Sequence, residues 1–467
     1  MVFLLSGCAT TLKERAKLKR LYDKSAQYHK PDRNPVIVIP GILGSRLVDD
    51  KTGMTVWGAF RTDYANPNSD KGAKLIALPL AYGPVEAAQN QTNIRPDGVL
   101  ENLDIKLAGI PISIQAYAGI LNTLGAGSYR DESLGLNSID YGTDHFTCFQ
   151  FDYDWRQDIP TNAARLEAFM DEKRKLVQQN YSRDYGIEDA PVQFDIVAHS
   201  MGAILSRYFA RFGGSDLQAI SETEVTWAGT QYIDRLILVA PPNAGSLEAM
   251  DQLINGFNTG RPLLPYYHQA LIGSFPSVYQ LMPRARHGAV IWNGDEKQPI
   301  KDLLDPDLWQ DMKWGLSGED EKTDAVLKRI MPDIASAERR RDIARQFQKE
   351  ALQRAKQFQK VMDIPAAPPD GFEMFLVAGD NQPTPAIASI NKSTAAFSIY
   401  KYELGDKTVL RSSALMDERV AQSWKPSLVS PIDWSSTMFI PAKHRTITNG
   451  PIFENNILYW LLEKPRK

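Results

Sequence analysis

The stretch Phe194-Asp-Ile-Val-Ala-His-Ser-Met-Gly202 decides the fold of this chain. Residues 194–198 form a short apolar run, as expected of a strand that is buried within a parallel sheet. Ala198 and Gly202 lie two positions before and two positions after Ser200, and such small residues permit a tight turn from strand into helix. A turn of this kind exposes the serine hydroxyl above the sheet, so Ser200 is the candidate nucleophile. The alternative is an ordinary helix N-cap serine, which rarely follows a buried strand without a loop.

Apolar runs alternate with helical segments along much of the chain. Buried strands are predicted at Val36–Ile39, Phe146–Phe151, Leu236–Val239 and Phe372–Val377, and a helix is predicted over Thr161–Gln179. Strands that alternate with helices indicate βα units on a mostly parallel sheet that is flanked by helices. Together with the strand-to-helix turn, this pattern predicts an α/β-hydrolase fold.

In the interval 251–370, strands and helices no longer alternate. This interval is helical in pattern, rich in Pro, Trp and Tyr at first and strongly charged later. We expect a helical cap or lid here, inserted into a hydrolase core of residues 34–250 and 371–467. Residues 9–33 are charged and helical in pattern, and they predict an N-terminal arm.

A histidine is the expected general base for a serine nucleophile. α/β-Hydrolases order their catalytic triad as serine, acid and histidine, so the base should follow Ser200 in the chain. His268 and His287 fall in the expected cap, whereas His444 lies in a loop before the final helical stretch. His444 is therefore the expected base. His199 adjoins the nucleophile, but neighbouring side chains point apart at such a turn.

The acid and the oxyanion hole complete the expected site. Asp380 and Asp406 both follow the predicted sheet strands and precede the base, and their spacing alone leaves the choice of acid open. An oxyanion hole needs the backbone N–H after the nucleophile, here that of Met201, and a second N–H from an early loop. The glycine-containing loop 40–44 follows the first buried strand, and Ile42 is its expected donor.

Composition excludes several classes of function. The chain has 467 residues, 43% of them hydrophobic, and a net charge of −3, which is typical of a globular protein and favours no nucleic-acid partner. The basic stretch 339–360 is interleaved with acidic residues, as in a solvated helix face. No cluster of His, Cys and carboxylate residues has metal-ligand spacing, so we expect neither a metal nor a cofactor. The sequence does not predict an oligomeric state.

The first eight residues resemble a targeting signal, and a chance tetrapeptide is the alternative. Leu5-Ser-Gly-Cys8 follows an apolar run and resembles the lipobox of bacterial lipoproteins, so residues 1–8 are expected to be a signal remnant and Cys8 the lipidated residue. The basic start of such a signal is missing, which predicts an upstream start codon. No stretch is long and apolar enough to span a bilayer. We therefore expect a lipoprotein that is anchored in the bacterial cell envelope, at the outer membrane or its periplasmic face.

Five short blocks occur in the order found in one known family, and the chain resembles the family of lecithin:cholesterol acyltransferase and lysosomal phospholipase A2. The blocks are Val36-Ile-Val-Ile-Pro-Gly-Ile-Leu-Gly-Ser-Arg-Leu47, Phe151-Asp-Tyr-Asp-Trp-Arg156, Ala198-His-Ser-Met-Gly202, Ser274-Phe-Pro-Ser-Val-Tyr-Gln-Leu-Met-Pro283 and Gly405-Asp-Lys-Thr-Val409. The resemblance implies that Asp406 is the acid, with Lys407 in place of the Gly of the family motif. It also implies that Trp57 contacts an acyl chain, although a buried core tryptophan is an equal alternative.

The resemblance further implies a serine esterase or acyltransferase that acts on lipid esters. We expect a phospholipase A or an O-acyltransferase, with a lipid ester as substrate and a membrane surface reached through the anchor. A triacylglycerol or polyester hydrolase would use the same chemistry. The alternative outside the enzymes is a catalytically silent envelope lipoprotein that binds lipid.

Overall fold

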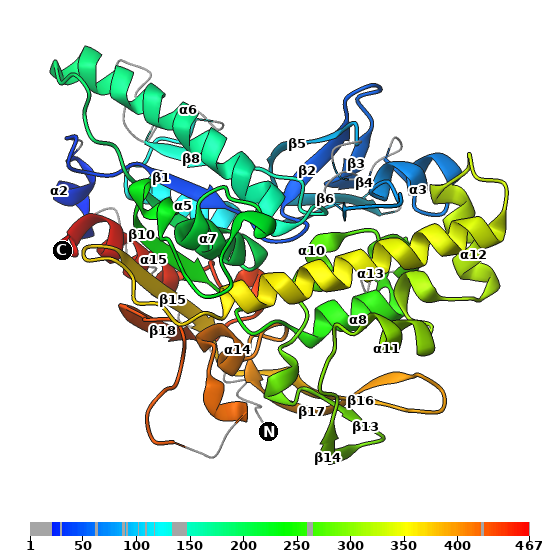
Figure 1. Cartoon of the computed structure of the whole chain (residues 1–467). Coiled ribbons are helices and arrows are strands. Elements are labelled where there is room, and N and C mark those ends of the chain that lie inside the picture. Colours follow the sequence, from blue (N-terminus) through cyan, green and yellow to red (C-terminus); the bar gives the residue numbers. More distant parts are fainter. Residues whose placement is uncertain are drawn as a thin grey trace, which may run out of the picture.

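A six-stranded sheet forms the centre of the molecule (Figure 1). The computed structural model describes residues 21–466 except residues 29, 61–63, 86–88, 90–91, 101, 108–109, 116, 133–146, 259–264 and 422–424. The strand order is β18 (Ser436–Ile440), β15 (Glu373–Gly379), β10 (Ile233–Val239), β9 (Phe194–His199), β1 (Val36–Ile39) and β8 (Cys148–Gln150). All neighbouring strands in this order run parallel.

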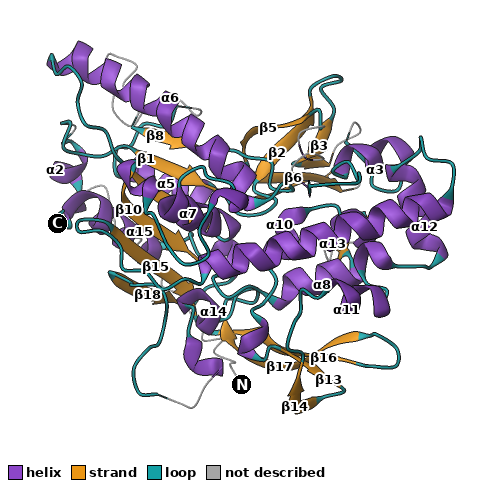
Figure 2. Cartoon of the chain, viewed as in Figure 1, coloured by secondary structure: helices purple, strands orange, loops and turns teal. Residues whose placement is uncertain are grey.

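Helices cover both faces of this sheet (Figure 2). Alternate residues of β1 enter different cores: Ile37 and Ile39 enter one, and Val36 and Val38 enter the other. The first core is covered by helices α6 (Ile159–Tyr185) and α7 (Met201–Phe212), and the second by α5 (Ala118–Ala126) and α15 (Pro451–Leu458). A strand buried on both faces must be apolar at every position, as β1 is. These layers confirm the predicted α/β fold with a parallel sheet between helices.

Local sequence explains where the long helix α6 begins and ends. The Asp158 side chain accepts a hydrogen bond from the Thr161 N–H, and Pro160 lies in the first turn, where its missing N–H costs nothing. Gly186 ends the helix in the left-handed conformation, with φ of 65°. The helix thus extends beyond the predicted range 161–179 at both ends.

The chain between β10 and β15 is mainly helical. Its helices are α8 (Leu247–Asn255), α9 (Gln269–Ile272), α10 (Pro276–Gln280), α11 (Pro306–Asp311), α12 (Glu321–Ile330) and α13 (Ala337–Met362). The sequence did not predict that a hairpin, β13 (Val290–Trp292) and β14 (Asp295–Pro299), also lies here. It joins β16 (Gln382–Ile390) and β17 (Phe397–Gly405) in a four-stranded sheet, so this interval shares a sheet with the chain that follows it.

The chain between β1 and β8 forms two small sheets that the sequence did not predict. Two three-stranded sheets form here, one from β2 (Ser45–Asp49), β3 (Thr55–Trp57) and β5 (Ile94–Val99), the other from β4 (Ala59–Phe60), β6 (Asn102–Leu107) and β7 (Ile110–Gln115). Helix α3 (Asp70–Ile76) lies beside them and packs on α12. Short strands such as β5, with the sequence IRPDGV, lack the apolar periodicity that would have revealed them.

Buried charges attach helix α13 to the hydrolase core. Arg354 of α13 forms an ion pair with Asp158, the N-cap of α6, and the Asp158 side chain is fully buried. Arg207 and Arg211 of α7 donate to backbone carbonyls in the last turn of α13, where the helix dipole favours a cation. The long helix that crosses the view in Figure 1 is therefore fixed to the helix that begins after Ser200.

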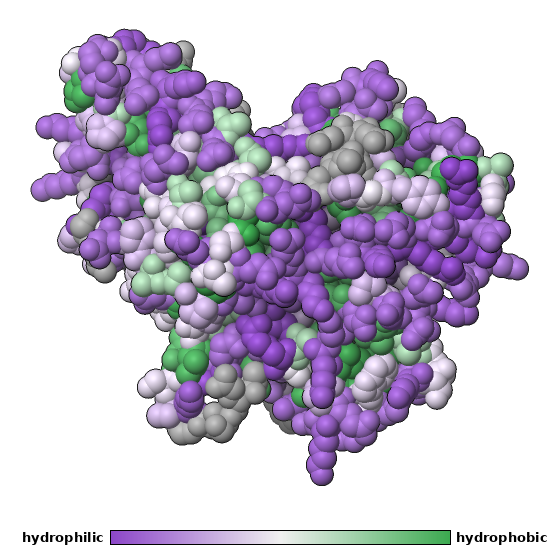
Figure 3. All heavy atoms as spheres, viewed as in Figure 1, coloured by the Kyte–Doolittle hydropathy of each residue, from purple (hydrophilic) through white to green (hydrophobic). Residues whose placement is uncertain are grey.

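Figure 3 shows a mostly hydrophilic surface, with apolar residues in small, scattered groups on the face in view. Within the described ranges, no helix combines the length and apolar character needed to cross a membrane.

Candidate active site

Ser200 sits on a strained turn between β9 and α7, at the C-terminal edge of the sheet. Its φ is 55° and its ψ is −122°, a conformation that a residue with a Cβ rarely adopts. The turn is held because the Ser200 N–H donates to the Val239 carbonyl at 2.8 Å and the Ser200 carbonyl accepts from Ala203 at 3.0 Å. An ordinary N-cap residue has an extended backbone, and its side chain accepts a hydrogen bond from its own helix. Ser200 has a different backbone conformation. Ser200 makes no such capping bond.

Small residues make this turn possible. A Cβ at Gly202 would collide with the carbonyl oxygens of Ile39 and Pro40, where the end of β1 meets the start of α7. Ala198 is fully buried at the end of β9. The small residue at position 202 is therefore required on steric grounds, and Ala198 packs within the core.

Ser200, His444 and Asp406 form one chain of hydrogen bonds. The His444 Nε2 lies 2.9 Å from the Ser200 Oγ, and the His444 Nδ1 lies 2.7 Å from the Asp406 Oδ2. An ionised carboxylate only accepts, so Nδ1–H donates to Asp406, and in the neutral ring Nε2 then accepts the serine O–H. The backbone adds a further tie, because the His444 N–H donates to the Asp406 carbonyl at 2.8 Å.

Asp406, and not Asp380, lies against His444, and the path of the chain explains why sequence spacing left the choice open. Asp380 directly follows β15, but the hairpin of β16 and β17 returns the chain to the end of that strand, where Asp406 lies. A Cβ at Gly379 would be 2.5 Å from the Asp406 Cβ, so the two positions are adjacent. Of these two aspartates, both of which the structure describes, Asp406 bonds to His444 and Asp380 does not, although Asp380 is nearer to the strand in sequence.

The loop after Asp406 keeps its conformation despite the Lys at position 407. Lys407 has φ of 83°, a left-handed value that favours glycine, which is the residue of the family motif at this position. The Asp406 Oδ1 accepts from the N–H groups of Thr408 and Val409, at 3.0 and 2.7 Å. These bonds leave Oδ2 free to accept from His444.

Burial and charge oppose each other at the histidine and the acid. Burial lowers the pKa of His444, but the Asp406 carboxylate and its hydrogen bond outweigh this, so the net pKa is raised. Glu248 adds to the increase and Arg445 opposes it. Burial raises the pKa of Asp406, yet His444 and the two backbone amides bring the net pKa below its usual value. Asp406 is thus ionised at neutral pH and favours the charged form of His444.

Two backbone N–H groups lie beside Ser200 without an acceptor. Residues 41–44 form a turn in which the Gly44 N–H donates to the Gly41 carbonyl at 3.0 Å, and Leu43 has φ of 64°. Within the described part of the chain, neither the Ile42 N–H nor the Met201 N–H has a hydrogen-bond acceptor. Two N–H groups that lack an acceptor beside a candidate nucleophile fit the binding of a developing anion.

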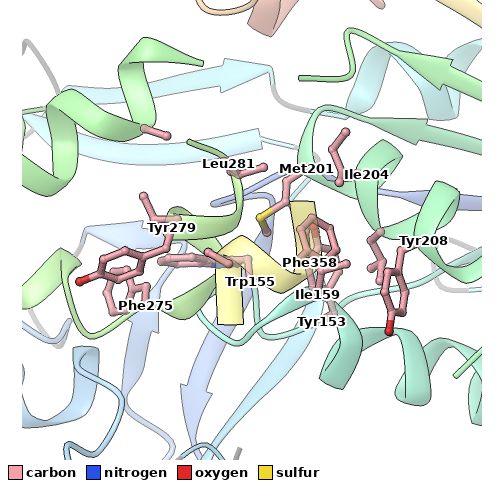
Figure 4. Close-up of a cluster of buried hydrophobic side chains, with 14 of the residues drawn as sticks. Tyr153, Trp155, Ile159, Met201, Ile204, Tyr208, Phe275, Tyr279, Leu281 and Phe358 are labelled. Atoms are coloured by element: carbon pink, nitrogen blue, oxygen red, sulfur yellow. The ribbon is translucent and has the colours of Figure 1, made fainter. Parts of the chain in front are cut away.

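Residues 151–156 hold the early loop in place. The Tyr153 hydroxyl donates to the Pro40 carbonyl at 2.8 Å, and the Trp155 indole N–H donates to the Ser45 carbonyl at 3.2 Å. Figure 4 shows both side chains with Met201 in one cluster of buried hydrophobic side chains. This block belongs to the family resemblance, but sequence reasoning assigned it no role.

Trp57 supports the early loop. It is buried, donates its indole N–H to the Leu43 carbonyl at 2.9 Å and packs edge-on against Trp155. Contact between Trp57 and an acyl chain stays a prediction. His268 caps α9 and His287 bonds to Glu418. Cys8 lies outside the described residues. In the part of the chain that the structure describes, no group of His, Cys, Asp and Glu side chains could hold a metal ion.

Comparison with protein families gives a match over most of the chain. The family model described as lecithin:cholesterol acyltransferase matches residues 134–413, which is more than half of the chain. The matched range includes Ser200 and Asp406, and it ends before His444. No curated protein sequence matches the chain.

Comparison with solved structures supports the fold. A chain in the crystal structure of the Tle4-Tli4 complex is 13% identical, with a TM-score of 0.56, and the alignment covers 92% of this chain and 98% of that chain. The mature Bacillus licheniformis lipase BlEst2 is 12% identical over 93% of this chain and 95% of that chain. Its TM-score is 0.30.

Proposed function

We propose, since the chain belongs to the lecithin:cholesterol acyltransferase family, that it is a serine esterase or O-acyltransferase that acts on lipid esters through Ser200, His444 and Asp406. The family makes it an enzyme of the lipid acyltransferase and lipase type. The hydrogen-bonded chain from Asp406 through His444 to Ser200 is the observation that carries the proposed mechanism.

The acylation step follows from these bonds. The Ser200 Oγ attacks the ester carbonyl carbon while its proton passes to the His444 Nε2. Asp406 stabilises the imidazolium that forms, which agrees with the raised pKa of His444. The N–H groups of Ile42 and Met201 bind the carbonyl oxygen as it becomes negative. His444 then gives its proton to the departing alcohol, and an acyl-Ser200 ester remains.

The second half of the reaction repeats these roles. Water or an alcohol attacks the acyl-Ser200 carbonyl and gives its proton to His444, and the proton then returns to the Ser200 oxygen as that bond breaks. A water acceptor makes the enzyme a lipase or phospholipase, and an alcohol acceptor makes it an acyltransferase. We propose the acyl ester of a phospholipid as the donor, which the family supports.

A covalent probe tests the nucleophile directly. A fluorophosphonate should label the wild-type protein and fail to label Ser200→Ala. Ser206→Ala is the matched control, since Ser206 lies on the same helix and donates only to the Gly202 carbonyl of that helix. Labelling of Ser200→Ala, or an unlabelled wild-type protein that is folded, would contradict the assignment and favour a catalytically silent lipid-binding protein.

Defined substrates test the acyl donor. Vesicles of phosphatidylcholine, an emulsion of triolein and a soluble polyester would each be incubated with the enzyme, with and without an added long-chain alcohol. Mass spectrometry should detect fatty acid or the new alkyl ester from the phospholipid first. Preferential turnover of triolein or the polyester would replace the proposed donor.

We also propose that Cys8 carries a lipid that anchors the chain in a bacterial cell envelope. The lipobox-like tetrapeptide at residues 5–8 supports this proposal. Metabolic labelling with an alkyne fatty acid should mark the wild-type protein in bacterial membranes and not Cys8→Ala. Equal labelling of both proteins would contradict it.

A further inference from the structure

A buried tyrosine joins the early loop to the histidine next to the nucleophile. The Tyr117 hydroxyl lies 2.6 Å from the Gly41 N and 3.1 Å from the His199 Nδ1. On the other side of the same ring, the His199 Nε2 lies 3.1 Å from the His444 carbonyl oxygen. One continuous path therefore runs from the loop that carries Ile42 to the backbone of His444.

The direction of each hydrogen bond along this path is determined. A carbonyl only accepts, so the His199 Nε2–H donates to His444. The Nδ1 of a neutral ring then accepts, and it takes the Tyr117 O–H. The Tyr117 oxygen in turn accepts the Gly41 N–H. Every donor on the path faces one acceptor, so a single arrangement satisfies all three bonds.

The path requires a neutral His199, and its surroundings provide one. Burial, followed by the neighbouring His444, lowers the pKa of His199 to about 3. The two rings lie 4.8 Å apart between centroids. A neutral neighbour at this distance leaves His444 free to become the cation during the reaction.

The bonds at Gly41 and His444 fix the two groups on which catalysis depends. The Gly41 N–H is held by Tyr117 and its carbonyl by Gly44, so the peptide that carries the Ile42 N–H has a defined orientation. The His444 N–H is held by Asp406 and its carbonyl by His199. The oxyanion donor and the general base are thus oriented through one shared network.

We propose that Tyr117 and His199 are positioning residues that hold the oxyanion donor Ile42 and the base His444 in register with Ser200. The proposal rests on the proposed function, because it assigns these two residues to the same serine chemistry. Neither side chain is proposed to touch the substrate. They act through the backbones of Gly41 and His444.

The test compares kcat per phosphonate-titrated site for hydrolysis of p-nitrophenyl butyrate. Tyr117→Phe keeps the ring and removes the hydroxyl, and we expect kcat to fall roughly 10- to 100-fold with KM little changed, since small misplacements at a reacting centre cost about 10²-fold. Tyr208→Phe is the matched control: Tyr208 is also buried, and its hydroxyl donates only to the Ser215 carbonyl. Its kcat should equal that of the wild type.

A double-mutant cycle shows whether the two residues act together. His199→Phe keeps a buried ring but removes both the Nδ1 acceptor for Tyr117 and the Nε2–H donor to the His444 carbonyl. If one network serves both ends, the double variant should lose less in kcat than the product of the single losses. Independent losses that multiply, at unchanged thermal midpoints, would overturn the shared network.

Three outcomes would overturn this proposal, and they separate it from the proposed function. Wild-type kcat in folded Tyr117→Phe, with Ser200→Ala inactive, would overturn the positioning roles and leave the nucleophile assignment intact. Full activity in Ser200→Ala would overturn both. A Tyr117→Phe protein that loses thermal stability but keeps kcat per titrated site would show a structural role only, and that result also overturns the proposal.

Discussion

Gly41 lies directly against the Ser200 side chain. A Cβ at position 41 would be 2.7 Å from the Ser200 Cβ and 3.3 Å from the Ser200 Oγ. Contacts below 3.0 Å between such atoms require movement, and here the movement must come either from Ser200 or from the loop that carries the Ile42 N–H. The absence of a side chain at Gly41 is what allows the loop of residues 41–44, the proposed oxyanion loop, to approach Ser200.

We therefore expect Gly41→Ala to lower kcat/KM for ester hydrolysis about 10²- to 10³-fold, the loss typical of a displaced oxyanion donor. Gly125→Ala is the control, because Gly125 lies in helix α5 and, apart from the backbone of that helix, no atom of the described residues would lie within 4 Å of its Cβ. That variant should keep full activity and gain up to about 1 kcal/mol in the free energy of unfolding. Wild-type turnover in Gly41→Ala would show that the donor lies elsewhere.

The pH dependence of kcat/KM should report the protonation of His444. The imidazole must be neutral to accept the serine proton, so activity falls as the pH drops through its pKa. Asp406 raises that pKa against the opposing effect of burial. In Asp406→Asn the raising influence is lost, so the acid limb of the profile should move to lower pH. The maximal rate should also fall by about 10³- to 10⁴-fold, as expected when the orienting carboxylate is lost.

Asp380→Asn is the control for this experiment, since Asp380 follows the same strand but does not bond to His444. Its pH profile and rate should match those of the wild type. A larger loss in Asp380→Asn than in Asp406→Asn would identify Asp380 as the acid instead.

The sequence predicts those site residues whose position depends on neighbouring residues in the chain, and it does not predict those that depend on distant segments. The turn at Ser200 lies within a few residues of one strand and one helix, so its pattern was readable. The acid was left open because the hairpin of β16 and β17 returns the chain to the end of β15, and no periodicity records where a hairpin returns. The resemblance to a family, and not spacing, selected Asp406.

Tyr117 shows the opposite extreme. It lies 82 positions before His199, ahead of a short helix, and nothing around it distinguishes it from a core aromatic residue. Its role depends on three segments that meet only in the folded chain. The parallel sheet was predictable from apolar runs, whereas the small sheets at residues 45–115 were not, because their strands are short and mixed in polarity.

The backbone at Lys407 predicts a stabilising substitution. Lys407 adopts φ of 83°, and a side chain there costs about 1–2 kcal/mol relative to a relaxed conformation. Glycine removes this cost but adds about 0.5–1 kcal/mol of chain entropy to the unfolded state. Lys407→Gly should therefore raise the free energy of unfolding by about 0.5–1 kcal/mol in urea titrations and keep the activity. Lys407→Ala removes the charge and keeps the strain, so a gain in that variant would rule out strain as the cause.

The ion pair between Arg354 and Asp158 predicts how firmly helix α13 is attached. Asp158 is fully buried, so Arg354→Met leaves an unpaired carboxylate, which typically costs about 3–5 kcal/mol. Asp158 keeps its bond from the Thr161 N–H, so we expect a loss of about 3 kcal/mol in the free energy of unfolding. Lys356→Met is the control on the same helix: its pair with Asp302 is about half exposed, and its removal should cost less than about 1 kcal/mol. Equal losses in the two variants would show that the buried pair does not attach the helix.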